Sequence, residues 1–525
     1  MAALTSHMIE DQSIDTEIEE PESAVHSNNL QTEANNMAAS SSVDPPTATT
    51  TPQACEIVKD ELDQEEKEEN HSSSNNHTLA STTQQSTPEC PIIQLEIPDE
   101  ESDEESNVDG FRKTCRFVAR IGWYACYYGA TPSRVEVFLQ NLMQAFGYTG
   151  SIFRVTNSEL FCAFSRQEYD DEQVIRLLEL KEGLHLHRLS LLSEVCKQVR
   201  RNEISQLQAW EASDEIAQSP DPWGFVAVST AFVLTGALAP AVFQGTWWDL
   251  LGGALSSIPV YLLTVGLPGP YQKALPLLSA FASTMVAITV QRLWVHDLHV
   301  ELVVLASVII QVPGYGASLA VSEIITNHIT AGVGRLVNAM VTLGLLVGGY
   351  WLANNLLEEW KTNEVDVVPA LDDSSTLTDD PVPVLCQILL CAPGLMICLC
   401  ILFQISPVDT FWSFGNLMLA YGTSYGVSVV SPAHKNVGVL MAAAVVTIYA
   451  QAWARWKDRP RSIVITPALV LLVSGSIGFR GLVRLTVEED GTAGLQEFAQ
   501  MFVVALLIMA GVLIGNLLLR APTTL

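Results

Sequence analysis

The chain has 525 residues, 48% of them hydrophobic, and a formal net charge of −31. Residues 1–109 hold 26 of the 58 acidic residues but only two basic ones, Lys59 and Lys67, so most of the net charge lies in this tail. Because the tail is rich in Ser, Thr, Asn and Glu, it buries too little apolar surface to offset chain entropy, and we predict a disordered acidic segment. No basic face with interleaved aromatic residues indicates a nucleic-acid partner.

The sequence lacks the usual signatures of cofactor, metal and enzyme chemistry. No P-loop, H-E-x-x-H or paired C-x-x-C motif occurs, and the ten cysteines are scattered. We therefore expect no cofactor, no metal site and no catalytic residues. One enzymatic alternative stays open, a hydrolytic group made of Cys162 with His185 and His187.

Residues 110–222 have the composition of a small globular α+β domain. Apolar residues recur at helical spacing from Phe117 to Tyr128, and Gly129 ends that helix. Thr131 before Pro132 predicts the N-cap of a second helix, which ends at residue 146. The remaining elements are expected in this order: strands at 151–155, 160–165 and 174–180, then helices at 187–201 and 205–216.

From residue 223 onward, long apolar runs dominate the sequence. They form two groups, 223–355 and 383–520, separated by an acidic linker at 356–382. A helix needs about 20 residues to cross a bilayer, so the predicted fold class is mainly α, a polytopic membrane protein with ten transmembrane helices. The expected spans are 223–243, 248–267, 274–292, 300–322, 330–353, 384–405, 409–429, 436–454, 462–480 and 497–519.

The two membrane regions repeat one another. A Phe-Gln-x-x-x-x-Asp pattern ending at Asp249 returns with Asp409 at its end, and the Thr-Ala-Gly at 330–332 returns at 492–494. Because each copy holds an odd number of spans, the second copy enters the membrane upside down. Two inverted five-helix repeats are typical of secondary transporters, whose substrate lies between the halves.

The distribution of basic residues predicts the orientation in the membrane. The linker at 356–382 is acidic, whereas the loop after the eighth span carries Arg455, Lys457, Arg459 and Arg461. We expect an integral multi-pass protein whose N-terminus and 110–222 domain are cytoplasmic. The sequence favours neither the plasma membrane nor a vacuole-like organelle.

The fourth and ninth spans are interrupted by Gly with Pro or Ser. Non-helical backbone inside a bilayer is tolerated only where protein or a water-filled cavity covers it, and the half-helix that follows carries a partial positive charge at its N-terminus. We predict a site for a substrate carboxylate at these interruptions, with a simple proline kink as the alternative. The candidate substrate-binding residues are Pro313, Gly314, Gly316, Ser318, Glu323, Asn327, Ser474 and Gly475.

Charged residues near the spans are candidates for coupling and gating. Asp249 and Asp409 each begin a helix, where a carboxylate either caps the helix or carries a coupling proton. Glu323 is the other candidate for proton coupling. Arg335 and Glu497 occupy matching places in the repeat, and we hypothesise a gating ion pair between them; two separate interface anchors are the alternative.

Three stretches carry a resemblance to a known family. Residues 128–136 resemble a Gly-x-x-[ST]-x-Arg-x-Glu motif, residues 311–336 a Val-Pro-Gly segment with a later Gly-x-x-Arg, and residues 474–482 its second-half counterpart, with Ser474 where Pro is usual. The family is that of threonine/serine exporter-like proteins, with fungal pheromone-regulated membrane protein relatives. The resemblance covers residues 111–520 and implies a cytoplasmic N-terminal domain, ten spans in two halves, and gradient-driven export of small hydroxy amino acids.

The combined prediction is a secondary transporter of small polar metabolites, threonine- or serine-like amino acids above all, that works by gradient-coupled alternating access. Its expected partners are a small-molecule substrate, a coupling proton and membrane lipid. The alternative is a non-transporting multi-pass membrane protein, whose spans anchor residues 110–222 as a signalling or assembly domain.

Overall fold

The computed structural model describes residues 103–166, 169–180, 183–294, 297–357, 382–431, 435–472, 475–486 and 491–519. Residues 1–102 of the predicted disordered tail and residues 358–381 of the acidic linker lie outside these ranges. Residues 103–109, which were also predicted to be disordered, form the start of a helix instead.

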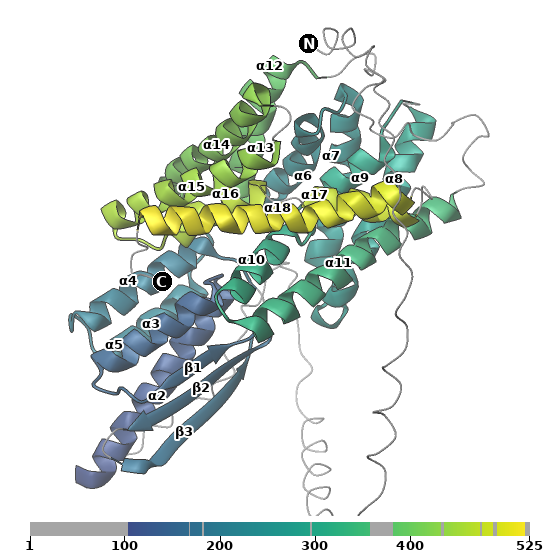
Figure 1. The fold of residues 1–525 in the computed structure, drawn as a ribbon. Coiled ribbons are helices and arrows are strands. Elements are labelled where there is room, and N and C mark those ends of the chain that lie inside the picture. Colours follow the sequence, from purple (N-terminus) through teal and green to yellow (C-terminus); the bar gives the residue numbers. More distant parts are fainter. Residues whose placement is uncertain are drawn as a thin grey trace, which may run out of the picture. The chain divides into compact units, whose positions relative to one another are not determined.

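The N-terminal domain combines four helices with a small antiparallel sheet of strand order β1-β2-β3; α2 and α3 pack on the sheet, and α4 and α5 pack on α2 (Figure 1). Its core contains the fully buried side chains of Trp123, Leu139 and Phe164. The helices and strands predicted for this domain are confirmed, but the first helix begins earlier, at Asp103, and the third strand begins earlier, at Tyr169. The elements are α2 (Asp103–Tyr127), α3 (Pro132–Ala145), β1 (Ile152–Val155), β2 (Glu159–Arg166), β3 (Tyr169–Glu179), α4 (Leu186–Arg200) and α5 (Gln206–Gln218).

The rest of the described chain is helical. The first half contains α6 (Phe225–Val242), α7 (Trp247–Gly266), η1 (Gly269–Ala274), α8 (Leu275–Leu293), α9 (Val300–Val308), α10 (Gly314–Ile325) and α11 (Ile329–Leu356). The second half contains α12 (Val384–Cys386), η3 (Gln387–Cys391), α13 (Ala392–Leu402), α14 (Pro407–Val430), α15 (Lys435–Lys457), α16 (Ser462–Leu472), α17 (Gly475–Thr486) and α18 (Gly491–Leu518).

Eight segments of the described chain are long and apolar enough to cross a membrane, fewer than the ten spans expected. The fourth expected span consists of two short helices, α9 and α10, neither of which reaches the length of a crossing by itself. The seventh is α14, which has 24 residues but is made less apolar by Asp409, Ser413 and Asn416. Length and composition therefore identify eight candidate spans.

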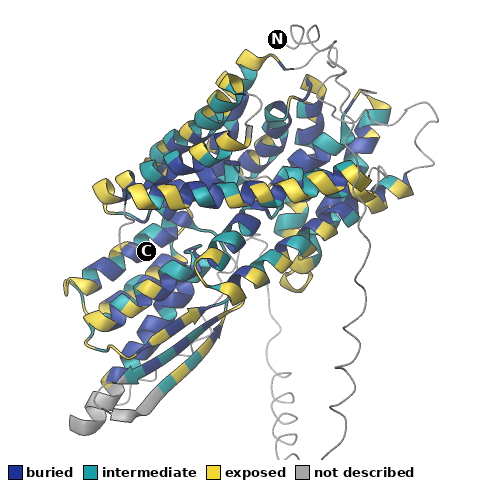
Figure 2. Cartoon of the chain, viewed as in Figure 1, coloured by how far each residue is buried: buried dark blue, intermediate teal, exposed yellow. Residues whose placement is uncertain are grey.

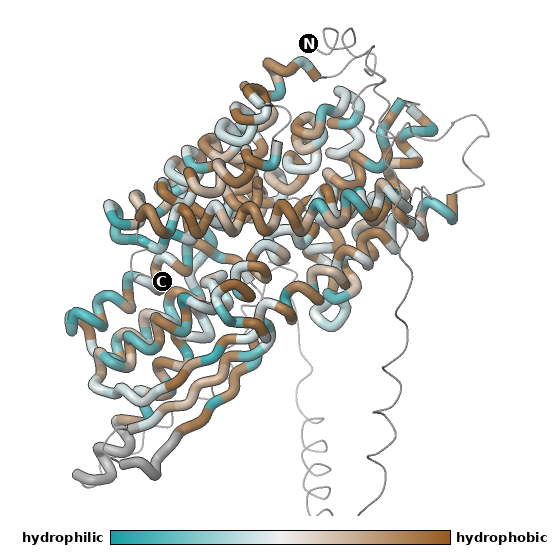
Figure 3. The backbone as a smooth tube through the Cα atoms, viewed as in Figure 1, coloured by the Kyte–Doolittle hydropathy of each residue, from teal (hydrophilic) through white to brown (hydrophobic). Residues whose placement is uncertain are grey.

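The exposed surface of the helical bundle is apolar. Helix α18 shows long exposed stretches in Figure 2, and the same helix is largely hydrophobic in Figure 3. Leu506, Leu513 and Leu517 on α18, together with Leu262 on α7 and Val430 on α14, are among its exposed large hydrophobic side chains. Apolar surface of this extent is unfavourable in water, so it indicates contact with lipid.

Helices of the two halves follow the same order at the shift seen in the sequence. Gly314 in α10 and Gly475 in α17 are 161 positions apart. The long helices α11 and α18 carry the two Thr-Ala-Gly patterns, which are 162 positions apart. These correspondences agree with the internal repeat.

Candidate functional site

A cavity of about 940 Å³ lies where the two interrupted segments meet. Pro313, Gly314 and Gly316 line it from the first half, and Gly475 lines it from the second. Other lining side chains include Arg335 and Asn338 on α11, Gln500 on α18, and Thr342, Ser424, Ser428 and Asn436. Four of the predicted substrate-binding residues therefore border one cavity, which has the size of a ligand pocket.

The two interruptions touch each other through backbone atoms. A Cβ atom on Gly475 would lie 2.6 Å from Cγ1 of Val312, and 3.1 and 3.2 Å from the Cα and N atoms of Gly314. A β-branched side chain and a backbone have little freedom to move away, so this contact requires glycine at position 475. Gly316 borders the same cavity, but a Cβ atom there would meet nothing within 4 Å.

The N-terminus of one helix faces the cavity. Helix α10 begins at Gly314, and its first-turn residues Tyr315 and Gly316 line the cavity. The first amides of a helix lack intrahelical acceptors and carry a partial positive charge. Such an end at a cavity favours an anionic group, such as a carboxylate.

Gln311 is a polar residue of the cavity that the predicted site did not include. Its Nε2 atom donates to the Ser279 hydroxyl at 2.9 Å, and its Oε1 atom is buried without a hydrogen-bond partner among the described residues. An unpaired buried carbonyl is unfavourable, so this oxygen is suited to accept a hydrogen bond from a ligand. The signal in the sequence was its place directly before the Val-Pro-Gly segment.

Arg335 and Glu497, predicted to pair across the halves, bind different partners. The Nε atom of Arg335 donates to both carboxylate oxygens of Glu323, at 3.1 and 3.3 Å, and Glu323 is buried. The Nη1 atom of Arg484 donates to Glu497 at 2.5 Å. Each pair joins the two helices of one hairpin, α10 with α11 and α17 with α18. Arg335 and Glu497 therefore each bind a residue of their own half, 12 and 13 positions away in the sequence.

These two ion pairs occupy matching positions with their charges exchanged. Glu323 corresponds to Arg484 at a shift of 161, and Arg335 corresponds to Glu497 at a shift of 162. The same hairpin geometry therefore holds a carboxylate on the shorter helix in one half and a guanidinium in the other.

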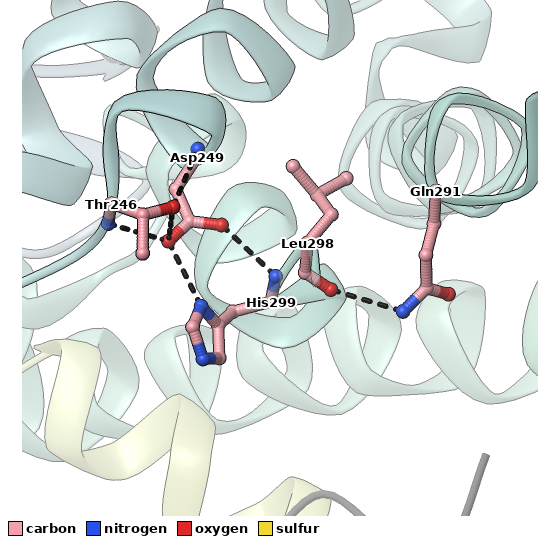
Figure 4. Close-up of polar contacts among 5 residues, drawn as sticks. All are labelled: Thr246, Asp249, Gln291, Leu298 and His299. Carbon is pink, nitrogen blue, oxygen red and sulfur yellow. Dashed lines mark hydrogen bonds and ion pairs between the residues drawn. The ribbon is translucent and has the colours of Figure 1, made fainter. Parts of the chain in front are cut away.

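Asp249 and Asp409 cap their helices. The Oδ2 atom of Asp249 accepts hydrogen bonds from the backbone N–H and the hydroxyl of Thr246, at 2.8 and 2.9 Å. The same oxygen lies 2.9 Å from Nδ1 of His299, and the backbone N–H of His299 donates to Oδ1 of Asp249 (Figure 4). Asp409 accepts from the Ser406 hydroxyl at 2.8 Å and from Arg459 at 2.5 Å. Neither aspartate borders the cavity.

The remaining predicted residues lie away from the cavity or outside the described chain. Ser318 is buried on α10, and its hydroxyl has no partner among the described residues. Asn327 is exposed, with φ of 64°, in the turn that follows the end of α10 at Ile325, so it shares no helical face with Glu323. Ser474 lies outside the described residues.

The N-terminal domain offers no activated nucleophile at Cys162. This thiol lies in β2, and burial raises its pKa to about 12. Burial also lowers the pKa of His185 and of His187 below their usual range. A thiol that stays protonated at neutral pH is a poor nucleophile, which disfavours the hydrolytic alternative.

The N-terminal domain forms one wall of the cavity. Residues 129–132 and 155–157 and the pair Gly183 and Leu184 are among the lining residues. Glu136 on α3, which also accepts the backbone N–H of Val155 at 2.9 Å, lies 3.0 Å from Nε2 of His328 in the turn between α10 and α11. The domain therefore contacts the hairpin that carries the buried ion pair.

Comparison with known proteins matches both halves of the chain. The family described as "Putative threonine/serine exporter" matches residues 116–357, and the one described as "Threonine/Serine exporter, ThrE" matches residues 389–518. A "Probable threonine/serine exporter" of Mycobacterium tuberculosis is 20% identical over 425 residues, which cover 78% of this chain and 76% of that protein. No solved structure matches the chain.

The chain belongs to the threonine/serine exporter family. The first match covers the N-terminal domain together with helices α6 to α11, and the second covers α13 to α18. Membership in this family, together with the apolar helices, makes the chain an integral multi-pass membrane protein of a transporter family.

Exchanging the charges of the Glu323–Arg335 pair tests the pairing in this exporter-family protein. We expect Glu323→Arg or Arg335→Glu alone to lower the free energy of unfolding by about 3–5 kcal/mol, because each places like charges together in a buried site. The double variant E323R/R335E is expected to recover most of this loss, since the second half already carries that polarity. Thermal unfolding in detergent is the measurement.

The matched control is the double variant R335E/E497R, which should show no recovery. Recovery in that variant, with none in E323R/R335E, would contradict the pairing described above.

The cap at His299 predicts a pH dependence of stability. His299 lies before α9, and its hydrogen bond to Asp249 outweighs desolvation and raises the pKa of the imidazole. A group whose pKa is raised by folding stabilises the fold below its unfolded pKa, about 6.5 for histidine, and this stabilisation is lost as the pH rises through the folded pKa. We therefore expect the unfolding temperature to fall as the pH is raised above about 6.5.

A His299→Gln variant should flatten this profile, measured by thermal unfolding between mildly acidic and mildly alkaline pH. Arg459→Lys, at the corresponding cap of the second half, should keep the wild-type profile because neither side chain titrates in that range. An unchanged profile in His299→Gln would assign the pH dependence to another group.

Proposed function

We propose that this protein is a secondary transporter that moves small amino acids of the serine and threonine type between two inverted repeats. One observation carries the proposal: residues next to both predicted interruptions, one from each half, border a single cavity. The N-terminus of α10 favours the substrate carboxylate, and Gln311 supplies an acceptor for a donor group of the substrate.

Contacts of the N-terminal domain support a topology of ten crossings. The domain contacts the turn at His328, the turn at Phe403 and Gln404, and the loop at Asp458. A domain on one side of a membrane reaches only loops on that side. Three crossings, by α6, α7 and α8, take the chain to the opposite side of the membrane, and a fourth crossing by α9 with α10 returns His328 to the side of the domain. Phe403 and Asp458 lie on the same side if both α14 and α15 cross.

With an odd number of crossings in each half, the two repeats are inverted.

The contact at Asp458 also supports a cytoplasmic N-terminal domain. Lys197 on α4 lies 3.2 Å from the Asp458 carboxylate, and the flanking residues Lys457 and Arg459 belong to the basic loop. Basic loops are cytoplasmic by the positive-inside rule. The domain and the N-terminus are thus assigned to the cytoplasm in the proposed topology.

The Glu323–Arg335 pair supports a proposal for coupling to protons. Arg335 borders the cavity, whereas Glu323 is buried behind it and holds the guanidinium. A proton on Glu323 removes the negative partner of Arg335, so that the guanidinium becomes available to a substrate carboxylate. Substrate and proton then bind together, which couples amino-acid movement to the proton gradient. The capping contacts of Asp249 and Asp409 give these residues a structural part instead.

Transport by the purified protein in liposomes tests the proposal. We expect labelled serine or threonine to cross the membrane when a pH gradient is imposed, and Gly475→Ala to reduce the flux at least about tenfold, because the methyl group forces the two interruptions apart. Gly316→Ala is the matched control: it changes a glycine of the same cavity where the added methyl group meets open space.

Well-folded wild-type protein that moves no amino acid under any imposed pH gradient would reject a transport function of this kind and favour the anchoring alternative. Equal flux in Gly475→Ala and wild type would reject the interruptions as the site of passage.

A further inference from the structure

The N-terminal domain presents polar groups to the cavity as well as closing it. Thr131, Thr156 and Asn157 are its polar lining residues. They come from two turns, one between α2 and α3 and the other between β1 and β2. Gly129 has φ of 96° and ends α2, which lets the chain reverse and bring the start of α3 to the cavity.

Asn157 lies where this domain meets α11. The Cβ atom of Asn157 would be 3.6 Å from a Cβ atom built on Gly334, the residue before Arg335. The β1–β2 turn does not use the Asn157 side chain, because Thr156 and Glu159 supply the hydrogen bonds of the turn. The amide group of Asn157 therefore lies beside the cavity without contributing a hydrogen bond to the turn that carries it.

The Asn157 carbonyl oxygen has an unmet need for a hydrogen-bond donor. Its Oδ1 atom is buried and has no partner among the described residues. An unpaired buried acceptor is a cost that native structures seldom retain without a use, such as binding water or a ligand. Because the same side chain lines the cavity, a ligand in the cavity can meet this need.

Thr131 gives a second indication from the other turn. Threonine before a helix usually accepts a hydrogen bond from the first turn, and the sequence predicts that role here. In the structure Thr131 is the residue before α3, but its side chain makes no cap hydrogen bond and borders the cavity. Two polar side chains of the domain are thus next to the cavity without serving the domain's own secondary structure.

We propose that the N-terminal domain completes the transport site, with Asn157 as a substrate-contacting residue. Its carbonyl oxygen accepts a hydrogen bond from a donor of the bound amino acid, either the ammonium group or a side-chain hydroxyl. The substrate is held between the N-terminus of α10 and the β1–β2 turn. This inference rests on the proposed transport function and assigns part of the substrate specificity to a domain outside the membrane.

Two substitutions of similar shape separate hydrogen bonding from packing. Asn157→Asp keeps an acceptor, whereas Asn157→Leu keeps the bulk and removes it. In liposome flux measurements on the full chain, we expect Asn157→Leu to raise the KM for serine about tenfold to a hundredfold, with maximal flux little changed. Asn157→Asp should stay near the wild-type KM. The control is Ser158→Ala, an exposed neighbour in the same turn, with wild-type behaviour expected.

A second substrate identifies the donor group. If Asn157 binds the ammonium group, Asn157→Leu raises the KM for alanine as much as that for serine. If it binds the hydroxyl, the change is confined to serine. Thr131→Val, which removes the other polar group, should give a smaller change in the same direction.

Two outcomes would overturn the inference: an unchanged KM in Asn157→Leu, or the same increase in KM for the leucine and aspartate variants. Thermal unfolding of each variant checks that the domain stays folded. These outcomes differ from a failure of the proposed function, in which the wild-type protein itself moves no amino acid.

Discussion

The contact between the backbones at Gly314 and Gly475 is the constraint on which the rest of the membrane region depends. A helix interrupted inside a bilayer leaves backbone groups that need cover from protein or from a polar cavity. Here each interruption lies against the other, and the absence of a side chain at Gly475 allows the approach. The cavity, the N-terminus of α10 beside it, and the packing of α10 and α17 against the long helices of the opposite half all follow from this meeting point.

Close packing by glycine also explains why the same short patterns occur in both halves. A Cβ atom on Gly332 would lie 2.7 Å from the carbonyl oxygen of Ala320, and one on Gly494 would lie 2.7 Å from the backbone N of Leu485. These glycines end the repeated Thr-Ala-Gly patterns, and each lets the long helix of a hairpin pack closely against the short one. The ion pairs differ between the halves: the pair Glu323 and Arg335 is exchanged for Arg484 and Glu497.

Much of this architecture was predictable because it depends on local chemistry. Proline and glycine mark the interruption at 311–316, Asp249 at the head of its helix was predicted as a candidate cap, and the strands of the N-terminal domain were predicted at their observed places. What failed depended on distances that the sequence does not contain. Arg335 was paired with Glu497 from their equivalent places in the repeat, although equivalent residues need not touch. Asn327 was predicted to bind the substrate, but its positive φ belongs to an exposed turn.

The part played by the N-terminal domain was the least predictable, because docking of a folded domain leaves no periodic signal. The structure ties this domain to both halves: Glu136 holds His328 in the first, while the backbone N–H groups of Leu186 and His187 donate to Phe403 and Gln404 in the second, at 3.3 and 3.0 Å. Alternating access requires the two halves to move against each other. A rigid domain attached to both halves resists such a movement until one set of contacts breaks. The described contacts with the first half include the carboxylate–imidazole hydrogen bond at the turn of the α10–α11 hairpin, and those with the second half include the backbone bonds and the Lys197–Asp458 pair. In the proposed transport cycle, loss of the hydrogen bond at His328 would release the hairpin from the domain. That release would draw Gly334 away from Asn157 and open the cavity on the side of the domain.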